Sequence, residues 1–193
     1  MSPAEVLETL ERNGAVQRGH FLLTSGRHSD VFAQKFRVLE HPRLARDFGD
    51  EIARSFAGEF DVVASPAVGA LILGFTTSLA AGARFIFTER VEGAMALRRG
   101  FEIAPGERVL VVEDVVTTGG SVQEVVTLVR KAGGEVAGVG ALVDRTNPRA
   151  ALDFGAPFRA LVRLDASSWP ADECPLCLRK EPIVEPGSSR LTA

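Results

Sequence analysis

Two adjacent acidic residues, Glu113 and Asp114, are the side chains whose type and position most clearly suggest chemistry. They follow an apolar run at residues 109–112 and precede a turn of small residues at 117–121. In an open parallel sheet the ligand crevice lies beyond the carboxyl ends of the strands, where this pair is expected. The turn would offer an anion its backbone N–H groups, its hydroxyls and the positive end of the following helix. The segment therefore predicts a phosphate site with two carboxylates beside it.

A sugar phosphate suits this combination, because two acidic side chains can accept hydrogen bonds from neighbouring ribose hydroxyls. The spacing thus predicts a ribose 5-phosphate as part of the ligand. The turn is not a Walker loop or a GxGxxG dinucleotide fingerprint, because neither pattern occurs there. The structural alternative is an ordinary strand-turn-helix junction whose Asp and Thr residues cap the helix. The full arrangement over residues 109–122 favours the phosphate site.

The elements that must position this segment alternate between apolar runs and helical stretches from about residue 60 onward. Strands are expected at 62–64, 84–87, 108–112, 136–143 and 158–164. Helices are expected at 70–81 and 121–132. This alternation predicts an α/β fold, a doubly wound and mostly parallel sheet with helices on both faces.

The N-terminal residues, 1–40, are expected to add a small hood. A helix should begin at Ser2-Pro3, and strands at 20–23 and 31–35 should flank a polar turn. A further helix with one apolar stripe should begin at His41-Pro42 and end near Gly58. We expect residues 1–193 to form a single domain, with the core at about 41–166 and a tail at about 167–193 that wraps the surface or frays.

Composition narrows the possible partners. The chain has 193 residues, of which 46% are hydrophobic and 24% charged, as in an ordinary soluble globular protein. Its net charge of −3 provides no overall positive field for a nucleic acid backbone. Its apolar runs are far shorter than the roughly 20 residues of a membrane span. We therefore expect a cytoplasmic protein without nucleic acid or membrane partners.

Cysteine and histidine give weaker signals. Cys174 and Cys177 form a Cys-Pro-Leu-Cys, which is half of a four-ligand zinc set. Pairing with the same motif of a second copy could complete such a set, but two free thiols are the expectation. His20, His28 and His41 lack metal-ligand spacing and are expected to be structural or to face solvent. No metal held directly by protein ligands is predicted.

On these residues the chain resembles the type I phosphoribosyltransferases. Their signature is an apolar strand, two acidic residues, two apolar residues and a Thr/Gly/Ser phosphate loop, which residues 113–121, EDVVTTGGS, match throughout. Segments 19–30, 63–69 and 141–145 are most similar to the members that use orotate. The resemblance implies transfer of the phosphoribosyl group from phosphoribosyl diphosphate to orotate. Orotidine 5′-phosphate and diphosphate would be formed, in de novo pyrimidine (UMP) biosynthesis, with Mg²⁺ as cofactor and a homodimer that shares its active sites.

The resemblance also implies a role for individual residues. The catalytic residues would be Glu113 and Asp114, which would contact the ribose hydroxyls, and Arg90, which would lie near the leaving diphosphate. A cis peptide is expected at Ala67-Val68. The phosphoribosyl diphosphate would contact Glu113, Asp114, Val115, Val116, Thr117, Thr118, Gly119, Gly120, Ser121, Ala67, Val68, Gly69 and Arg90. Orotate would contact Thr117, Arg145, Phe32 and Ala33.

The chain departs from the best-known members at two positions. Thr24 and Gly69 stand where those members carry lysines, and the mobile loop expected at 90–100 lacks their Lys and His cluster. Another cation must then neutralise the diphosphate. The candidates are Arg90, Lys35, Arg37 and Mg²⁺.

Two alternative functions stay open. The first is a phosphoribosyltransferase for another base. The positive charge of the Ser25-Gly26-Arg27 turn and of Arg145 argues against it, because such charge is what an anionic base such as orotate needs. The second is a regulator that senses phosphoribosyl diphosphate without catalysis. Such a regulator would carry a DNA-binding segment or a basic surface.

Overall fold

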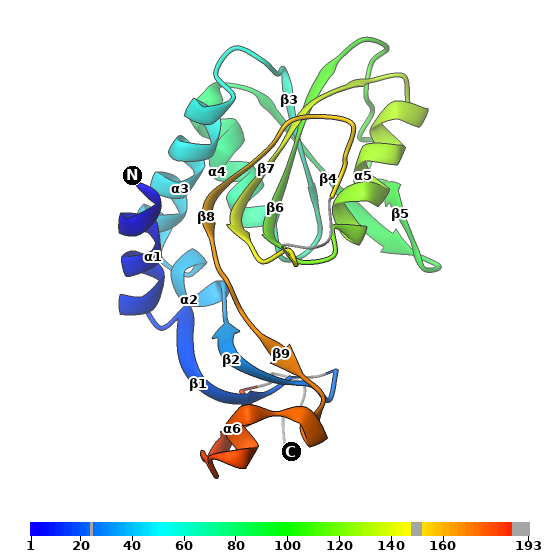
Figure 1. The fold of residues 1–193 in the computed structure, drawn as a ribbon. Helices are drawn as coiled ribbons and strands as arrows, with labels where there is room; N and C mark the ends of the chain where they lie inside the picture. The colour runs from blue at the N-terminus through cyan, green and yellow to red at the C-terminus, as the bar shows by residue number, and fades with distance from the viewer. Residues whose placement is uncertain (24, 148–151, 187–193) are drawn as a thin grey trace.

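The computed structural model describes residues 1–23, 25–147 and 152–186. They form two lobes, each built around its own sheet (Figure 1). The larger lobe holds a six-stranded sheet in the order β5-β4-β3-β6-β7-β8, and the smaller lobe, the hood, holds a four-stranded sheet in the order β10-β1-β2-β9. No helix in the described ranges has the length and apolar character of a membrane-crossing segment.

The larger sheet confirms the expected doubly wound α/β fold. Neighbouring strands are parallel, except for the antiparallel pair β4 and β5 at one edge. The strand order reverses between β3 and β6, and a doubly wound sheet binds its ligands at such a point. The strands are β3 (Val62–Pro66), β4 (Arg84–Val91), β5 (Ala94–Leu97), β6 (Arg108–Val116), β7 (Glu135–Asp144) and β8 (Phe158–Arg163).

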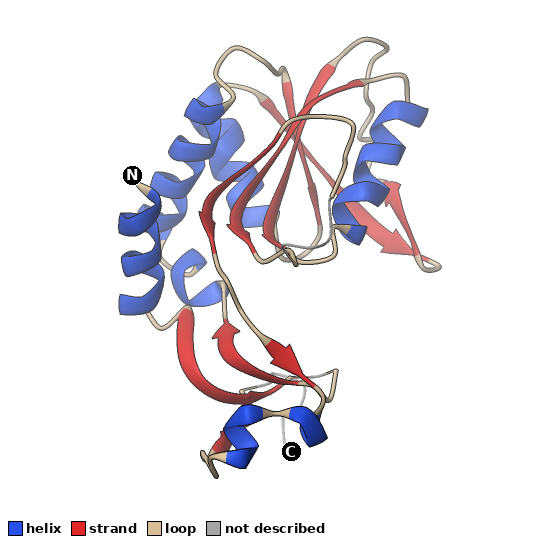
Figure 2. Ribbon diagram, viewed as in Figure 1, coloured by secondary structure: helices blue, strands red, loops and turns tan. Residues whose placement is uncertain are grey.

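Helices cover both faces of this sheet (Figure 2). The helices α1 (Pro3–Arg12), α3 (Pro42–Ser55) and α4 (Leu71–Ala81) lie on one face, and α5 (Gly120–Lys131) lies on the other. Alternate residues of β6 belong to two different hydrophobic cores, one on each face of the sheet. Leu110 and Val112 share a core with Phe48 of α3, whereas Val109 and Val111 pack with the buried valines of α5. Burial on both faces explains why this strand is apolar without alternation.

Local sequence signals define the ends of these helices. Ser2 caps α1 in a capping box with Glu5, and Pro3 occupies its first turn. Gly82 ends α4 in the left-handed conformation, with φ of 64°, which glycine adopts without a steric cost. The short helix α2 (Phe36–Leu39) then connects the hood to α3.

The hood is built from both ends of the chain. Its central strands are β1 (Val16–Leu22) and β2 (His28–Ala33). The edge strand β9 (Ser168–Trp169) pairs with β2, and β10 (Ile183–Val184) pairs with β1. The segment after residue 167 is thus held against the hood, because the open edges of β1 and β2 supply backbone partners to these short strands. The division into hood, core and tail stays a prediction.

Between the two edge strands the chain forms a 3-10 turn, Ala171–Glu173, and the short helix α6 (Pro175–Leu178). Both lie against the hood sheet, where Figure 1 draws them in orange. Leu176 is buried there and anchors α6 to the hood.

Candidate functional site

The loops after β3 and β6 meet at the carboxyl ends of the sheet. Ala64 of β3 is in register with Val111 of β6, so the residues that follow each strand become neighbours. Strand β6 continues through Val116, so Glu113 and Asp114 belong to the strand itself and are 8% and 2% exposed. The predicted acidic pair is therefore a buried feature at the switch point of the sheet.

Two cavities adjoin this pair. The first, of about 60 Å³, is formed by the turn after β6 and the beginning of α5. Gly119, with φ of 76°, precedes α5 and turns the chain so that the free N–H groups of its first turn border this cavity. The lining residues are Glu113, Val115, Val116, Thr117, Thr118, Gly119, Gly120, Ser121 and Val122. The predicted phosphate loop thus encloses an anion-sized hollow.

The second cavity, of about 230 Å³, lies between the two lobes and the β4-β5 hairpin. Its lining combines residues from the connection out of the hood, the end of β3 and the loop after it, strands β5 and β6, and the first turn of α5. These residues are Lys35, Pro66, Ala67, Gly69, Met95, Glu113, Asp114, Val115 and Ser121. Glu113, Val115 and Ser121 line both cavities, so one ligand can occupy both.

Lys35 supplies a positive charge to the lining of the second cavity. Its Nζ lies 2.5 Å from Asp114 Oδ2, and the Asp114 side chain is 3% exposed. The other carboxylate oxygen, Oδ1, accepts a hydrogen bond of 2.6 Å from Val115 N. Oδ2 has a charged neighbour but no aligned hydrogen-bond donor among the described residues. A ligand that binds this oxygen would therefore have to share it with Lys35 or displace Lys35 from it.

Glu113 differs from Asp114 in its electrostatic environment. Burial, and after it the neighbouring charge of Asp114, together raise the pKa of Glu113 to about 8, although the backbone hydrogen bond and the charge of Lys35 act in the opposite direction. Its Oε1 accepts a hydrogen bond of 3.1 Å from Asp114 N. In the ligand-free protein a proton therefore stays on Glu113 at pH 7.

The loop after β3 shows the expected cis peptide bond between Ala67 and Val68. Gly69, the next residue, lies against the ion pair. A Cβ atom at this position would come closer than 3.0 Å to both Asp114 Oδ2 and Lys35 Nζ. A side chain at this position would therefore have to displace the ion pair, and Lys35 from another element occupies the space beside Gly69.

Of the residues expected at the base, Thr117 lines the first cavity, whereas Arg145, Phe32 and Ala33 line neither cavity and lie near the lobe junction. Arg145 N donates a hydrogen bond of 2.8 Å to Val116 O, which ties it to the residue before Thr117. Burial lowers the pKa of the Arg145 guanidinium, and the charge of Asp30 in the hood opposes that shift. Phe32 and Ala33, both half-buried, end β2 shortly before Lys35. The structure thus brings Arg145 close to the hood.

Arg90 is not brought into the second cavity. Its guanidinium forms an ion pair of 2.8 Å with Glu124 of α5 and donates to Gly93 O. Its neighbour across the hairpin, Met95, does line the cavity. The hairpin therefore borders the site, while the guanidinium of Arg90 is paired with Glu124 of α5 and does not line the cavity.

The other two candidate cations, Arg37 and Lys35, differ in their position relative to the second cavity. Arg37 is exposed and lies 3.8 Å from Glu40, and Thr24 lies outside the described residues. Lys35, which the sequence suggested only as one of several substitutes, is the cation in the cavity. Met95 was missed, because an apolar residue in a short hairpin carries no chemical signal. Lys35 is the last residue of the strand predicted at 31–35, and this position is the available signal for it.

Comparison with known proteins agrees with this geometry. The model of the phosphoribosyl transferase domain family matches residues 37–173. The orotate phosphoribosyltransferase of Caldanaerobacter subterraneus subsp. tengcongensis is 48% identical over 192 residues, covering 99% of this chain and 100% of that protein. The crystal structure of orotate phosphoribosyltransferase from Aeropyrum pernix has a TM-score of 0.70 at 26% identity, over 82% of this chain and 93% of that one. The corresponding Mycobacterium tuberculosis enzyme has a TM-score of 0.70 at 32% identity, over 84% and 96%. The chain therefore belongs to the orotate phosphoribosyltransferase family.

Proposed function

We propose that the protein transfers the 5-phosphoribosyl group from phosphoribosyl diphosphate to orotate, which gives orotidine 5′-phosphate and diphosphate in pyrimidine biosynthesis. The acidic pair between the two cavities is the observation that carries this proposal. The small cavity at the start of α5 suits the 5′-phosphate. The larger cavity suits the ribose and the diphosphate. Membership of the family supports the choice of orotate.

The reaction breaks the bond between ribose C1 and the diphosphate oxygen and forms a bond from C1 to a ring nitrogen of orotate. Positive charge develops on the ribose as the first bond breaks, and Asp114 lies where its charge can offset it. We assign the same task to Glu113 in its ionised form. Negative charge develops on the diphosphate, and Lys35 in the lining of the cavity can stabilise it. We assign the same task to Arg90, whose hairpin borders the cavity and would have to release Glu124.

We also propose Mg²⁺ as the cofactor. Asp114 Oδ2 is a buried carboxylate oxygen without an aligned donor, and oxygen atoms are the ligands that Mg²⁺ prefers. Asp114 and Glu113 would hold the ion, directly or through water. When bound, Mg²⁺ supplies positive charge that offsets the charge of the diphosphate.

The base site is assigned to residues at the junction of the two lobes. Orotate carries a carboxylate, and the guanidinium of Arg145, partly removed from water, is a suitable partner for it. Thr117 lies next to the residue that anchors Arg145. Phe32 and Ala33 end the hood strand that leads into Lys35. We propose that these four residues contact the base.

A base-panel assay tests the function. The full chain is incubated with Mg²⁺, phosphoribosyl diphosphate and one of orotate, uracil, hypoxanthine, guanine or adenine, and diphosphate release is followed. We expect release with orotate alone. Release with another base would keep the fold and reassign the pocket. Binding of phosphoribosyl diphosphate without turnover on any base would favour a sensor instead.

A homodimer is proposed from an exposed apolar stripe along α4. The stripe consists of Val68, Ile72, Phe75 and Leu79, which are 71%, 39%, 55% and 65% exposed. Ile72, Phe75 and Leu79 lie on one face of α4, and Val68 lies in the loop before the helix. An exposed apolar stripe of this kind is typical of a protein interface. Because the stripe begins at Val68, the active site would lie beside the subunit contact and could be shared.

The variant Leu79→Arg is expected to dissociate this dimer, because a buried unpaired charge at an interface is costly. Analytical ultracentrifugation should show monomers, and the specific activity of the wild type should fall on dilution as the dimer dissociates. Val184→Arg is the control, because Val184 is an exposed apolar residue in the hood. Dimers that persist in Leu79→Arg would contradict the proposed interface.

We place the reaction in the cytoplasm. The two cysteines, Cys174 and Cys177, are free thiols rather than a disulfide, which suits a reducing compartment. Fractionation of cells that produce the protein, followed by detection with an antibody, tests this location. Recovery in the membrane or secreted fraction would contradict it.

A further inference from the structure

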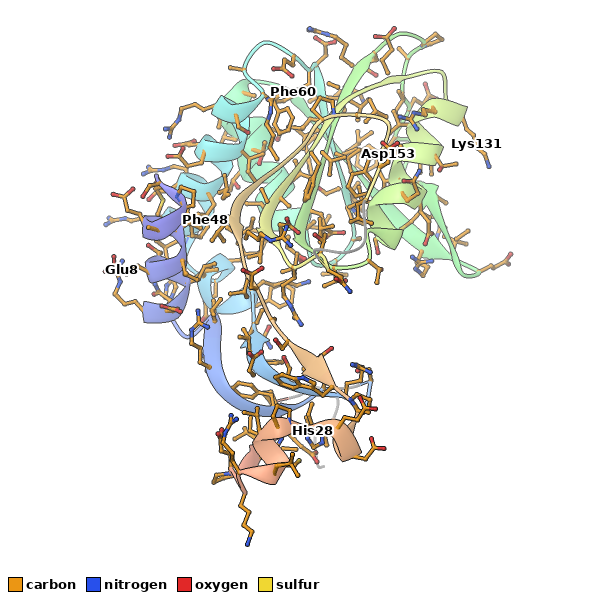
Figure 3. All side chains as sticks on the ribbon, in the orientation of Figure 1. Glu8, His28, Phe48, Phe60, Lys131 and Asp153 are labelled. Carbon is orange, nitrogen blue, oxygen red and sulfur yellow. The ribbon has the colours of Figure 1, made fainter. Side chains whose placement is uncertain are left out.

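A second cluster of chemically active side chains lies in the hood, away from the acidic pair. It consists of His20, His28, Cys174 and Cys177, whose ligand atoms all lie within 4.8 Å of one another. Figure 3 labels His28 in the hood, beside the C-terminal segment. The sequence predicted separate histidines and free thiols, because the two pairs are far apart in the chain. The fold brings them together.

The pairing of the hood strands accounts for this meeting. His20 lies on β1 opposite Ile183 of β10, and His28 lies on β2 opposite Trp169 of β9. The Cys-Pro-Leu-Cys segment connects β9 to β10, so both of its ends are attached to the strands that carry the histidines. The histidine pair and the cysteine pair are therefore held close together by paired strands rather than by a flexible tail.

The distances suit four ligands around one ion. Cys174 Sγ and Cys177 Sγ lie 3.6 Å and 3.7 Å from His20 Nε2. Cys177 Sγ also lies 3.2 Å from His28 Nδ1. Bond lengths of about 2.3 Å to sulfur and 2.0 Å to nitrogen place such atoms roughly 3.5 Å apart around a tetrahedral zinc ion. The two nitrogens, 2.8 Å apart, would separate by about half an ångström when the ion enters.

A backbone contact orients one of the histidines. His20 Nδ1 lies 2.9 Å from Glu181 O, so this nitrogen carries the proton and donates it to the carbonyl. Nε2 then presents its lone pair to the cluster. Histidine ligands of metals are commonly held by such a hydrogen bond from the other ring nitrogen. Three of the four residues, His20, His28 and Cys174, are at most 7% exposed, so water has little access.

We propose that His20, His28, Cys174 and Cys177 bind one structural zinc ion. Two thiolates and two imidazoles form a donor set that suits zinc, and four protein ligands leave no open position for catalysis. The ion would join β1 and β2 to the segment between β9 and β10. It would thus hold the hood together, independently of the chemistry at Glu113 and Asp114.

The first test is the metal content of the full chain, purified without a metal-affinity step and dialysed against metal-free buffer. We expect about one zinc ion per chain. Replacement by Co²⁺ should give the intense visible absorption of a tetrahedral site and a thiolate charge-transfer band. A protein that binds no stoichiometric zinc, or one isolated under reducing conditions with a Cys174–Cys177 disulfide, would overturn the proposal.

The second test uses Cys177→Ser, because Cys177 is the exposed member and its replacement should leave the fold intact. Zinc affinity should fall by more than the roughly 10- to 100-fold that the loss of an outer-shell partner costs. A zinc-selective chelator should lower the unfolding temperature of the wild type but not of this variant. His41→Asn is the control, because His41 lies outside the cluster. Unchanged zinc affinity in Cys177→Ser, or the same chelator response in both proteins, would contradict the site.

Discussion

Asp114→Asn is expected to lower kcat by about 100- to 1,000-fold, the range found when one preorganised electrostatic group is removed from an active site. The amide keeps the size of the side chain and an oxygen for the hydrogen bond from Val115 N. It loses the negative charge beside the ribose and the partner of Lys35. Steady-state kinetics with phosphoribosyl diphosphate and orotate measure the change, and thermal unfolding checks that the variant is folded at the assay temperature.

Asp61→Asn is the matched control. Asp61 also lies at an end of the sheet, but it precedes β3 and pairs with Arg108 at 2.6 Å, far from both cavities. This variant should keep the turnover of the wild type. The assigned role of Asp114 is wrong if Asp114→Asn is folded and turns over at the rate of the control.

The substitution Glu113→Gln is expected to remove the pH dependence that the Glu113 proton gives to the free energy of unfolding. The folded protein holds the pKa of Glu113 at about 8, above its ordinary value of 4.5, because burial disfavours the charged form. Below about pH 4.5 both the folded and unfolded states bind this proton. Between about pH 4.5 and 8 only the folded state does, so the free energy of unfolding falls as pH rises, by up to about 1.4 kcal/mol per pH unit. Above about pH 8 the folded state has also released the proton, so the stabilising contribution of this proton to the free energy of unfolding is fully lost.

Urea unfolding of the ligand-free protein at about pH 5, 7 and 9 measures this effect. The wild type should lose stability relative to Glu113→Gln as the pH increases, because glutamine has no proton to release. Glu8→Gln, which changes an exposed glutamate of α1, should follow the wild type. A wild type and a Glu113→Gln variant with parallel stability profiles would show that Glu113 is not held protonated.

The core of the fold could be predicted because each of its elements leaves a local pattern. Strand β6 is apolar throughout residues 109–112 because both of its faces are buried there, and α5 carries buried valines at helical spacing. The acidic pair and the phosphate loop occupy consecutive residues, so their proximity needs no tertiary information. The hood edge strands, of two residues each, leave no such pattern. Their structure depends on partners about 140 to 160 residues away.

The same reasoning applies to individual side chains. The cis peptide at Ala67-Val68 was predictable from the resemblance. The position of Lys35 depends on how the hood is placed against the core. The direction of Arg90 depends on its ion pair with Glu124 of α5. These contacts join distant segments, so neither spacing nor composition indicates them.

The construction of the hood from both ends of the chain has a consequence for biosynthesis on the ribosome. The core sheet is complete once residue 163 has emerged, and its contacts can form at that stage. Strands β1 and β2 must wait for β9 and β10, which are synthesised last. A nascent or truncated chain that lacks residues 168–184 would therefore expose two unpaired strand edges. Premature release should yield a folded core that aggregates through its hood.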